Sequence, residues 1–246
     1  MITVKLLGGL GNQMFQLAFA TALQHRGYRV QLNKDSLVEG THREYSLGVF
    51  GDFLFGDPTG TVIAEKSMPF NEAYLKPEDP STMFGYWQTE KYFKGIEHKL
   101  SRGFSFRRPP SERVSDLISL VRTTNSAFVH VRRGDYVGLQ SFHGMPTMDY
   151  YNAAIARTGA SNILIFSDDP EWCKKNFGYH VIEGTSKYED MQIMSACRHA
   201  VIANSSFSWW AAWFQCSGGT VVAPKQWFAD KNVDSRDIIP ERWVKL

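Results

Sequence analysis

The stretch ITVKLLGGLGNQMFQLAFATALQHRGYRVQL (residues 2–32) determines how the first half of the chain is expected to fold. Apolar residues alternate over 2–6 as in a β-strand, residues 8–13 form a glycine-rich turn, and apolar residues over 15–23 have helical spacing. A second strand follows over 28–32. This order predicts two parallel strands joined by a right-handed crossover, so we expect a Rossmann-like α/β domain.

The second half shows the same alternation from residue 126 onward. We expect strands over 127–131, 163–166, 181–182, 201–203 and 221–223. We expect helices over 149–157, 170–176, 189–199 and 206–215. The chain is therefore predicted to be an α/β protein with a Rossmann-like N-terminal domain over residues 1–123 and a Rossmann-like C-terminal domain over residues 124–246. Ligands of such sheets bind where the carboxyl ends of the strands meet.

Composition excludes several classes of protein. The 246 residues are 43% hydrophobic and 21% charged, with a net charge of +2, which excludes a disordered chain and binding to nucleic acid mainly through charge. Cys173, Cys197 and Cys216 are too far apart for a disulfide framework or a zinc site. Neither the N-terminal apolar stretch nor the run over 201–214 predicts a signal peptide or a membrane helix, so the cytoplasm is the expected location.

The turn GGLGNQ (8–13) follows a strand and opens a helix, so its backbone N–H groups and the helix dipole can face an anion. It is similar to a dinucleotide-binding turn, but Met14 occupies the position of the third glycine, which weakens the case for NAD. The turn could also be purely structural. The amide side chains of Asn12 and Gln13, which we expect at the rim of a ligand cleft, favour a binding role.

The segment HVRRGDY (130–136) ends an apolar strand, where open α/β sheets place ligand-binding groups. Burial of an unpaired guanidinium is costly, so Arg132 and Arg133 either pair with nearby carboxylates or meet an anion. Arginine is well suited to bidentate contact with phosphate. The residues alone leave both interpretations open.

Two further strand ends carry polar side chains that suit a nucleotide. In SDDP (167–170), one of Asp168 and Asp169 is expected to cap the next helix, and the other can accept hydrogen bonds from a base or ribose. NSSF (204–207) offers donors at a helix start, either as a phosphate site or as helix caps.

The sequence has no Asp-x-Asp triplet and no metal-ligand spacing, so we expect arginine and helix dipoles rather than a metal ion to stabilise a diphosphate.

Five blocks of the chain form one ordered pattern. They are GGLGNQMFQ (8–16), GYWQTEKYF (85–93), HVRRGDY (130–136), FSDDPEW (166–172) and ANSSFSWWAAW (203–213). Together they closely resemble the α-1,2-fucosyltransferases of glycosyltransferase family 11. The resemblance implies a GT-B fold, in which two Rossmann-like domains face each other across a cleft. It also implies inverting transfer of L-fucose from GDP-fucose to the 2-hydroxyl of a terminal β-galactoside, without a metal ion or a cofactor.

The same resemblance implies roles for individual residues. The residues expected to bind GDP-fucose are Gly9, Gly11, Asn12, His130, Arg132, Arg133, Asp168, Ser205, Ser206 and Phe207. The family pattern places arginine on the diphosphate, His130 near the guanosine and Asp168 at the guanine edge. Arg132, Asp135 and Asn12 are expected to be catalytic, with Arg132 stabilising the charge that grows on the β-phosphate.

The acceptor is expected in the first domain, with contacts from Trp87, Glu90 and His143. The general base stays open among Asp135, Glu90 and His143, although Asp135 is rather expected to pair with the arginines. Residues 45–84 look abbreviated relative to the family. Nucleic acid is not an expected partner, and a lipid-linked acceptor would bring the protein to a membrane surface.

Three alternatives to this activity stay open. The first is fucosyl transfer to another acceptor or linkage. The second is a nucleotide-cofactor oxidoreductase, which would explain the opening strand and helix but not the paired arginines. The third is a lectin, which would use the aromatic residues without needing a diphosphate site.

Overall fold

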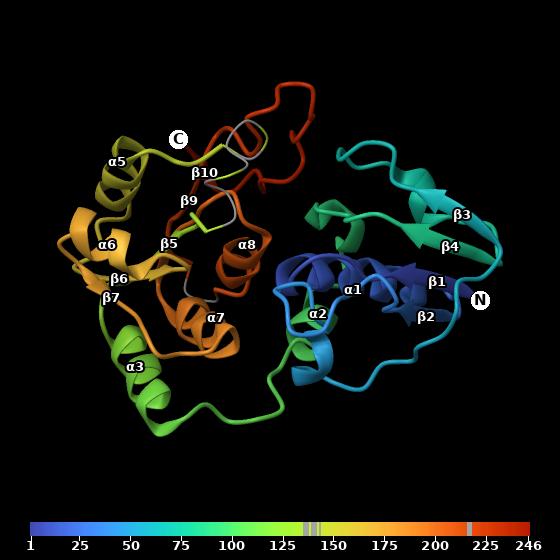
Figure 1. Cartoon of the computed structure of the whole chain (residues 1–246), viewed down its shortest axis with the longest axis horizontal. Helices are drawn as coiled ribbons and strands as arrows, with labels where there is room; N and C mark the ends of the chain where they lie inside the picture. The colour runs from blue at the N-terminus through green and yellow to red at the C-terminus, as the bar shows by residue number, and fades with distance from the viewer. Residues whose placement is uncertain (135–137, 139–141, 143, 216–217) are drawn as a thin grey trace. The chain divides into compact units, whose positions relative to one another are not determined.

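The structure is a computed structural model of the 246-residue chain. It describes residues 1–134, 138, 142, 144–215 and 218–246. The chain divides into two compact units, and each is an α/β unit with its own parallel sheet (Figure 1). The first unit comprises Met1–Pro109 and Val233–Pro240, and the second comprises Pro110–Asn232 and Glu241–Leu246.

The first unit has a four-stranded parallel sheet in the order β2-β1-β4-β3. Its strands are β1 (Ile2–Lys5), β2 (Val30–Asn33), β3 (Thr61–Ala64) and β4 (Ser81–Phe84). Helix α1 (Leu10–His25) joins β1 to β2, which confirms the predicted strand, helix and strand at the start of the chain. The other helical segments are η1 (Leu47–Val49), η2 (Glu72–Leu75), η3 (Glu90–Phe93) and α2 (Glu97–Gly103).

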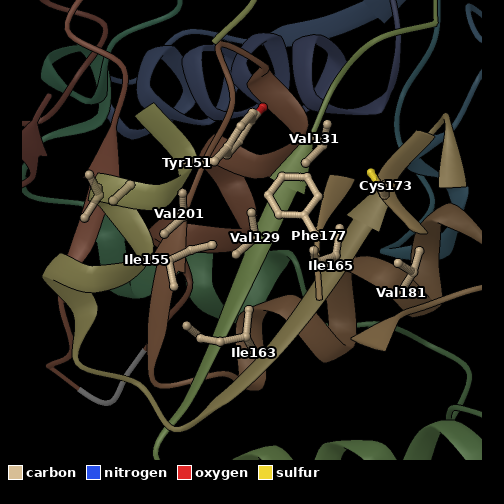
Figure 2. Packing of buried hydrophobic residues seen from close by; sticks show 13 residues of the cluster. Val129, Val131, Tyr151, Ile155, Ile163, Ile165, Cys173, Phe177, Val181 and Val201 are labelled. Atoms are coloured by element: carbon tan, nitrogen blue, oxygen red, sulfur yellow. The ribbon is translucent and has the colours of Figure 1, made fainter. Parts of the chain in front are cut away.

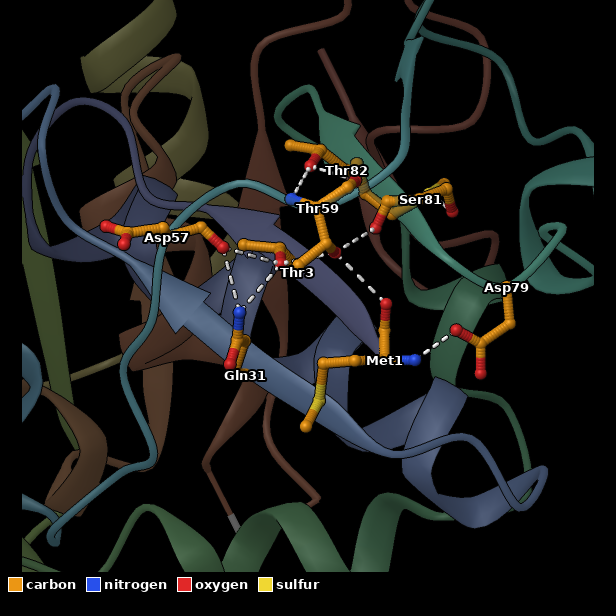
Figure 3. Close-up of polar contacts among 9 residues, drawn as sticks. Met1, Thr3, Gln31, Asp57, Thr59, Asp79, Ser81 and Thr82 are labelled. Carbon is orange, nitrogen blue, oxygen red and sulfur yellow. Dashed lines mark hydrogen bonds and ion pairs between the residues drawn. The ribbon is translucent and has the colours of Figure 1, made fainter.

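A polar network fixes the connection between β2 and β3 against one face of this sheet (Figure 3). Thr3, Gln31 and Thr82 are neighbours in the strand register, so their side chains share that face. The Gln31 amide donates to the Asp57 carbonyl at 2.9 Å, and the hydroxyls of Thr3 and Thr59 are 3.0 Å apart. The Thr59 N–H donates to the Thr82 hydroxyl at 2.8 Å. These bonds satisfy polar groups that the crossing segment would otherwise bury without partners.

Within the described residues, the second unit has a six-stranded parallel sheet in the order β10-β9-β8-β5-β6-β7. Its strands are β5 (Ser126–Val131), β6 (Asn162–Ser167), β7 (His180–Val181), β8 (His199–Val201), β9 (Val221–Ala223) and β10 (Val244–Lys245). Its helices are α3 (Glu112–Thr123), α5 (Met148–Thr158), α6 (Pro170–Asn176), α7 (Lys187–Ala196) and α8 (Ser206–Trp213). The predicted alternation is confirmed, but the strand expected over 201–203 lies two residues earlier, and the prediction lacked α3 and β10.

One face of this second sheet is covered by an apolar core that β5 and β6 form with α5 and α6 (Figure 2). Val129 and Val131 of β5 and Tyr151 of α5 are at most 1% exposed in this core. Successive residues of a strand point to opposite faces, so His130 lies on the other face of β5. There its ring contacts Phe207, in the first turn of α8.

The division into units differs in two places from the boundary expected at residue 123. Helix α3 belongs to the second unit because it packs against α7 and β5. The segment 233–240 returns to the first unit, where the Asp237 carboxylate pairs with Lys91 Nζ at 2.6 Å. Neither feature has a local sequence signal, because both depend on contacts between residues that are far apart in the chain.

Aromatic and cysteine side chains contribute to the core of the second unit. Trp209 is fully buried and stacks on Trp213 with ring centroids 6.4 Å apart, so this face of α8 belongs to the core. Cys173 and Cys197 are buried free thiols, and Cys216 lies outside the described residues. No helix in the described part of the chain has both the length and the apolar character needed to cross a bilayer.

Candidate functional site

Arginine and aspartate side chains from two adjacent strands meet at the carboxyl edge of the second sheet. Arg132 and Arg133 follow β5, and Asp168 and Asp169 follow the neighbouring strand β6. Arg132 Nη1 lies 3.0 Å from Asp168 Oδ2, and Asp168 Oδ1 accepts the Arg133 backbone N–H at 2.9 Å. Arg133 Nε donates to Asp169 Oδ2 at 3.1 Å. The Arg132 and Asp168 side chains are 27% and 26% exposed, so a ligand can reach this pair from solvent.

The structure therefore shows carboxylate pairing for both arginines. Partly exposed ion pairs of this kind add little stability, about 0–1 kcal/mol each, so stability alone does not explain two of them at one strand end. Their clearer effect is geometric, because Asp168 and Asp169 hold both guanidinium groups at the edge where parallel sheets bind ligands.

Asp169 and Trp172 complete this arrangement. Asp169 caps α6 through its Oδ1, which accepts the Trp172 N–H at 3.1 Å, so the prediction that one of the two aspartates is a helix cap is confirmed. The Arg133 guanidinium carbon lies 4.0 Å from the centroid of the Trp172 ring, a cation–π contact that further orients the arginine. Trp172 was not predicted as a site residue. The one signal for it in the sequence is its position three residues after the capping aspartate.

Gly134 packs directly against the Asp168 carboxylate. A Cβ atom at this position would lie 2.6 Å from Asp168 Oδ2, which is closer than non-bonded atoms can approach. Any side chain here would therefore displace the carboxylate that holds Arg132 and the Arg133 backbone.

His130 is a buried neutral imidazole next to these arginines. It is 6% exposed, and its ring centroid lies 5.7 Å from that of Phe207. Burial, with a smaller contribution from the positive charge of Arg132, lowers the pKa of His130 to about 3. Among the described residues, its Nδ1 atom is buried and has no hydrogen-bond partner. A buried polar atom without a partner is costly in a folded protein, so this nitrogen needs a water molecule or a ligand to satisfy it.

The turn after β8 brings Ser205, Ser206 and Phe207 to the same edge, because β8 is the other neighbour of β5. Ser205 occupies the N-cap position of α8 without a side-chain capping bond. Asn204 is buried and anchors the turn, with Nδ2 donating to the Trp227 carbonyl at 2.9 Å. The residues predicted from three separate blocks thus gather at the carboxyl ends of β8, β5 and β6.

In the first unit, the glycine-rich turn and the start of α1 hold Gly9, Gly11 and Asn12. Gly9 is the N-cap of α1, and Gly11 is buried. Asn12 Oδ1 accepts a hydrogen bond from Gln88 Nε2 at 2.7 Å, which links this turn to the segment after β4. The expectation that Gln13 lies at a rim was wrong: Gln13 is fully buried and its amide makes three hydrogen bonds to backbone groups.

The residues expected to contact the acceptor differ in how far they are exposed to solvent. Trp87 was expected to contact the acceptor, but its side chain is fully buried and stacks on Phe19 with ring centroids 4.3 Å apart, so this expectation was wrong. The exposed aromatic side chain of the same block is Tyr86, at 41%. Glu90 is partly exposed at the start of η3.

Asp135 and His143 lie outside the described residues, so neither can be placed as an acceptor contact or a base. The arginine partners seen in the second unit are Asp168 and Asp169. Across the described ranges, no three His, Cys, Asp or Glu side chains are grouped so that they could hold a metal ion.

Comparisons with known proteins extend this description. Residues 76–246 match the model of Glycosyl transferase family 11. An alpha-1,2-colitosyltransferase of Escherichia coli is 33% identical, covering 100% of this chain and 98% of that protein. Galactoside 2-alpha-L-fucosyltransferase SEC1 of Bos taurus is 25% identical, covering 89% of this chain and 65% of that protein. The crystal structure of the fucosyltransferase NodZ from Bradyrhizobium gives a TM-score of 0.53 at 13% identity, covering 85% of this chain and 91% of that one.

The structural similarity shows the fold, which is α/β with two parallel sheets and of the GT-B type. The family match covers more than half of the chain and contains the arginine and aspartate cluster. The colitosyltransferase extends the sequence similarity over the whole chain, including the glycine-rich turn. The chain therefore belongs to glycosyltransferase family 11.

Proposed function

We propose that this glycosyltransferase moves L-fucose from GDP-fucose to the 2-hydroxyl of a galactoside, with inversion at the sugar carbon and without a metal ion. The observation that carries the proposal is the pair of arginines, each held by an aspartate, at the carboxyl edge of β5 and β6. Fucose and the α-1,2 linkage are supported by the galactoside fucosyltransferases among the relatives, and GDP-fucose by the soaked crystals of NodZ.

The described side chains suit the diphosphate and the guanosine of such a donor. Arg132, accessible and oriented by Asp168, is suited to bind the β-phosphate as charge grows on it during bond breaking. His130, buried and neutral, offers a nitrogen to the guanosine, and Ser205 and Ser206 offer donors to phosphate at the start of α8. The full proposed donor set is Gly9, Gly11, Asn12, His130, Arg132, Arg133, Asp168, Ser205, Ser206 and Phe207.

The proposed reaction forms one bond and breaks one. The acceptor oxygen attacks C1 of the sugar on the face opposite GDP, and the bond between C1 and the β-phosphate oxygen breaks with its electron pair passing to GDP. Positive charge develops at C1 in the transition state, by analogy with glycoside hydrolysis. The acceptor proton passes to a general base, for which Asp135, Glu90 and His143 remain the candidates. Asn12 is the further catalytic contact proposed in the first unit.

Colitosyl transfer is a second candidate, because the 33% identical relative over the full chain is named for that activity. Colitose is L-fucose without the 3-hydroxyl, so the two sugars differ at a single position. A site that hydrogen-bonds a substrate hydroxyl rejects the analogue without it by roughly 10⁴-fold, whereas an apolar site discriminates far less. Donor competition therefore separates the two activities.

The test is a donor screen with lactose as acceptor and the product linkage determined by NMR. GDP-fucose, GDP-colitose, GDP-mannose and UDP-galactose are compared at equal concentration. Transfer from GDP-fucose in α-1,2 linkage supports the proposal, and preferential transfer from GDP-colitose supports the second candidate. Transfer from a UDP-sugar alone would contradict both.

A further inference from the structure

Trp87 has an unusual backbone conformation. Its φ angle is +56°, and among the described residues it is the one non-glycine residue with a positive φ. A left-handed conformation is unfavourable for a residue with a bulky side chain, and such strain persists only where the surroundings enforce it. The fully buried Trp87 ring supplies part of this enforcement, because it is stacked on Phe19 with an interplanar angle of 10°.

Glu65, which directly follows β3, supplies the rest. Its Oε2 accepts the backbone N–H of Tyr86 at 2.7 Å and that of Trp87 at 3.2 Å. Hydrogen bonds to a carboxylate are stronger than neutral ones, so they can hold a strained backbone. Gly85 makes room for this contact, because a Cβ atom there would lie 2.5 Å from the Glu65 Cβ.

The strained segment leads directly into Gln88. Gln88 is 8% exposed, and its Nε2 donates to Asn12 Oδ1 at 2.7 Å. This bond determines which end of the Asn12 amide is the acceptor and therefore how the amide is turned. The left-handed conformation of Trp87 sets the direction in which the backbone enters Gln88. Glu65 is therefore connected to Asn12 through backbone and side-chain contacts.

We infer that Glu65 is a positioning residue for catalysis, which acts by holding the left-handed turn at Trp87 so that Gln88 orients the amide of Asn12. The inference rests on the proposed function, in which Asn12 contacts the substrate. A direct acid or base role for Glu65 does not fit its surroundings, because Oε2 is occupied by two backbone N–H groups and Oε1 is buried.

The test is a double-mutant cycle on kcat for transfer from GDP-fucose to lactose. Glu65→Ala should lower kcat roughly 10- to 100-fold, as expected when a catalytic group is misplaced by a remote change. Glu65→Gln keeps an oxygen acceptor and should stay within about threefold of wild type. Glu65→Ala added to Asn12→Ala should cost almost nothing more, because residues that act through one group are not additive. Glu72→Ala, at an exposed glutamate of the same unit, is the control.

Two further measurements keep the inference testable. Gln88→Leu removes the contact to Asn12 without touching Glu65, and it should reproduce the kcat loss even if Glu65→Ala does not fold. The Asn12 side-chain amide signals, assigned with Asn12→Ala in a nitrogen–proton NMR spectrum, should shift in Glu65→Ala and Gln88→Leu but not in Glu72→Ala. This readout does not depend on turnover.

Full additivity of Glu65→Ala with Asn12→Ala, or unchanged Asn12 amide signals in Glu65→Ala, would overturn the inference. Failure of the wild-type protein to use any GDP-sugar would instead contradict the proposed function. The NMR comparison would still decide whether Glu65 orients Asn12.

Discussion

Acidification should destabilise the second unit through His130. Burial holds its pKa at about 3 in the folded protein, whereas an unperturbed histidine has a pKa near 6.5. Between these two values the unfolded chain binds a proton that the folded chain does not, so the free energy of unfolding falls as the pH decreases from about 6.5 towards 3. Above about pH 6.5 the histidine is neutral in both the folded and the unfolded chain, so this loss of stability is absent.

The size of this loss of stability follows from how far the pH lies below the ordinary pKa of histidine. At pH 5 the pH lies about 1.5 units below the pKa of the unfolded histidine, and each unit is worth about 1.4 kcal/mol. His130 should therefore lower the free energy of unfolding by about 2 kcal/mol at pH 5 relative to pH 7.5. His130→Gln cannot titrate. Its free energy of unfolding should therefore fall by about 2 kcal/mol less than that of wild type between these two pH values.

The assay is urea unfolding at pH 7.5 and pH 5, followed by tryptophan fluorescence. This signal reports mainly on the second unit, which contains every tryptophan except Trp87. His98→Gln, at an exposed position, is the control for loss of a histidine as such. If wild type and His130→Gln lose the same stability on acidification, His130 is not held neutral by burial and its place in the proposed site must be revised.

Three other predictions concern the arginine and aspartate cluster. Arg132→Ala should leave the fold intact in circular dichroism and lower kcat about 10²- to 10³-fold, as is typical for loss of one preorganised charge contact; near-normal turnover would exclude the proposed role. Gly134→Ala should push the Asp168 carboxylate away from Arg132 and weaken GDP binding about tenfold, as measured by calorimetry. An unchanged affinity for GDP would show that the carboxylate does not orient the arginine. Transfer should continue in excess EDTA, and loss of turnover that added magnesium or manganese restores would refute metal independence.

The second unit was more predictable from sequence than the first. Its strands are buried and apolar, and signals such as the capping box of Ser186 and Glu189 mark where its helices begin. In the first unit β3 is a short edge strand whose residues 61, 62 and 64 are exposed, so it lacks the apolar pattern that identifies strands. β4 is equally short, and its pairing with β1 joins residues about 80 positions apart in the chain, which no local pattern indicates.

The strand ends of the candidate site could be predicted, but individual side-chain environments could not. Arg132, Asp168 and Ser205 gather because parallel strands end at one edge, which the chain order implies. Burial depends on tertiary packing instead, so the sequence could not tell that Gln13 and Trp87 are internal. The role inferred for Glu65 also had no signal, because it depends on a contact between the residue after β3 and backbone groups about 20 residues later.

Calorimetric titration of GDP and GMP against wild type and Arg132→Ala most directly tests whether the Arg132 site binds a nucleotide diphosphate. Wild type should bind GDP at least tenfold more tightly than GMP, because only GDP carries the β-phosphate that Arg132 is proposed to contact. Arg132→Ala should lose roughly 10- to 100-fold in GDP affinity while its GMP affinity changes little, as expected for one hydrogen-bonded charge contact. An unchanged preference for GDP over GMP in Arg132→Ala would contradict the assignment of this site.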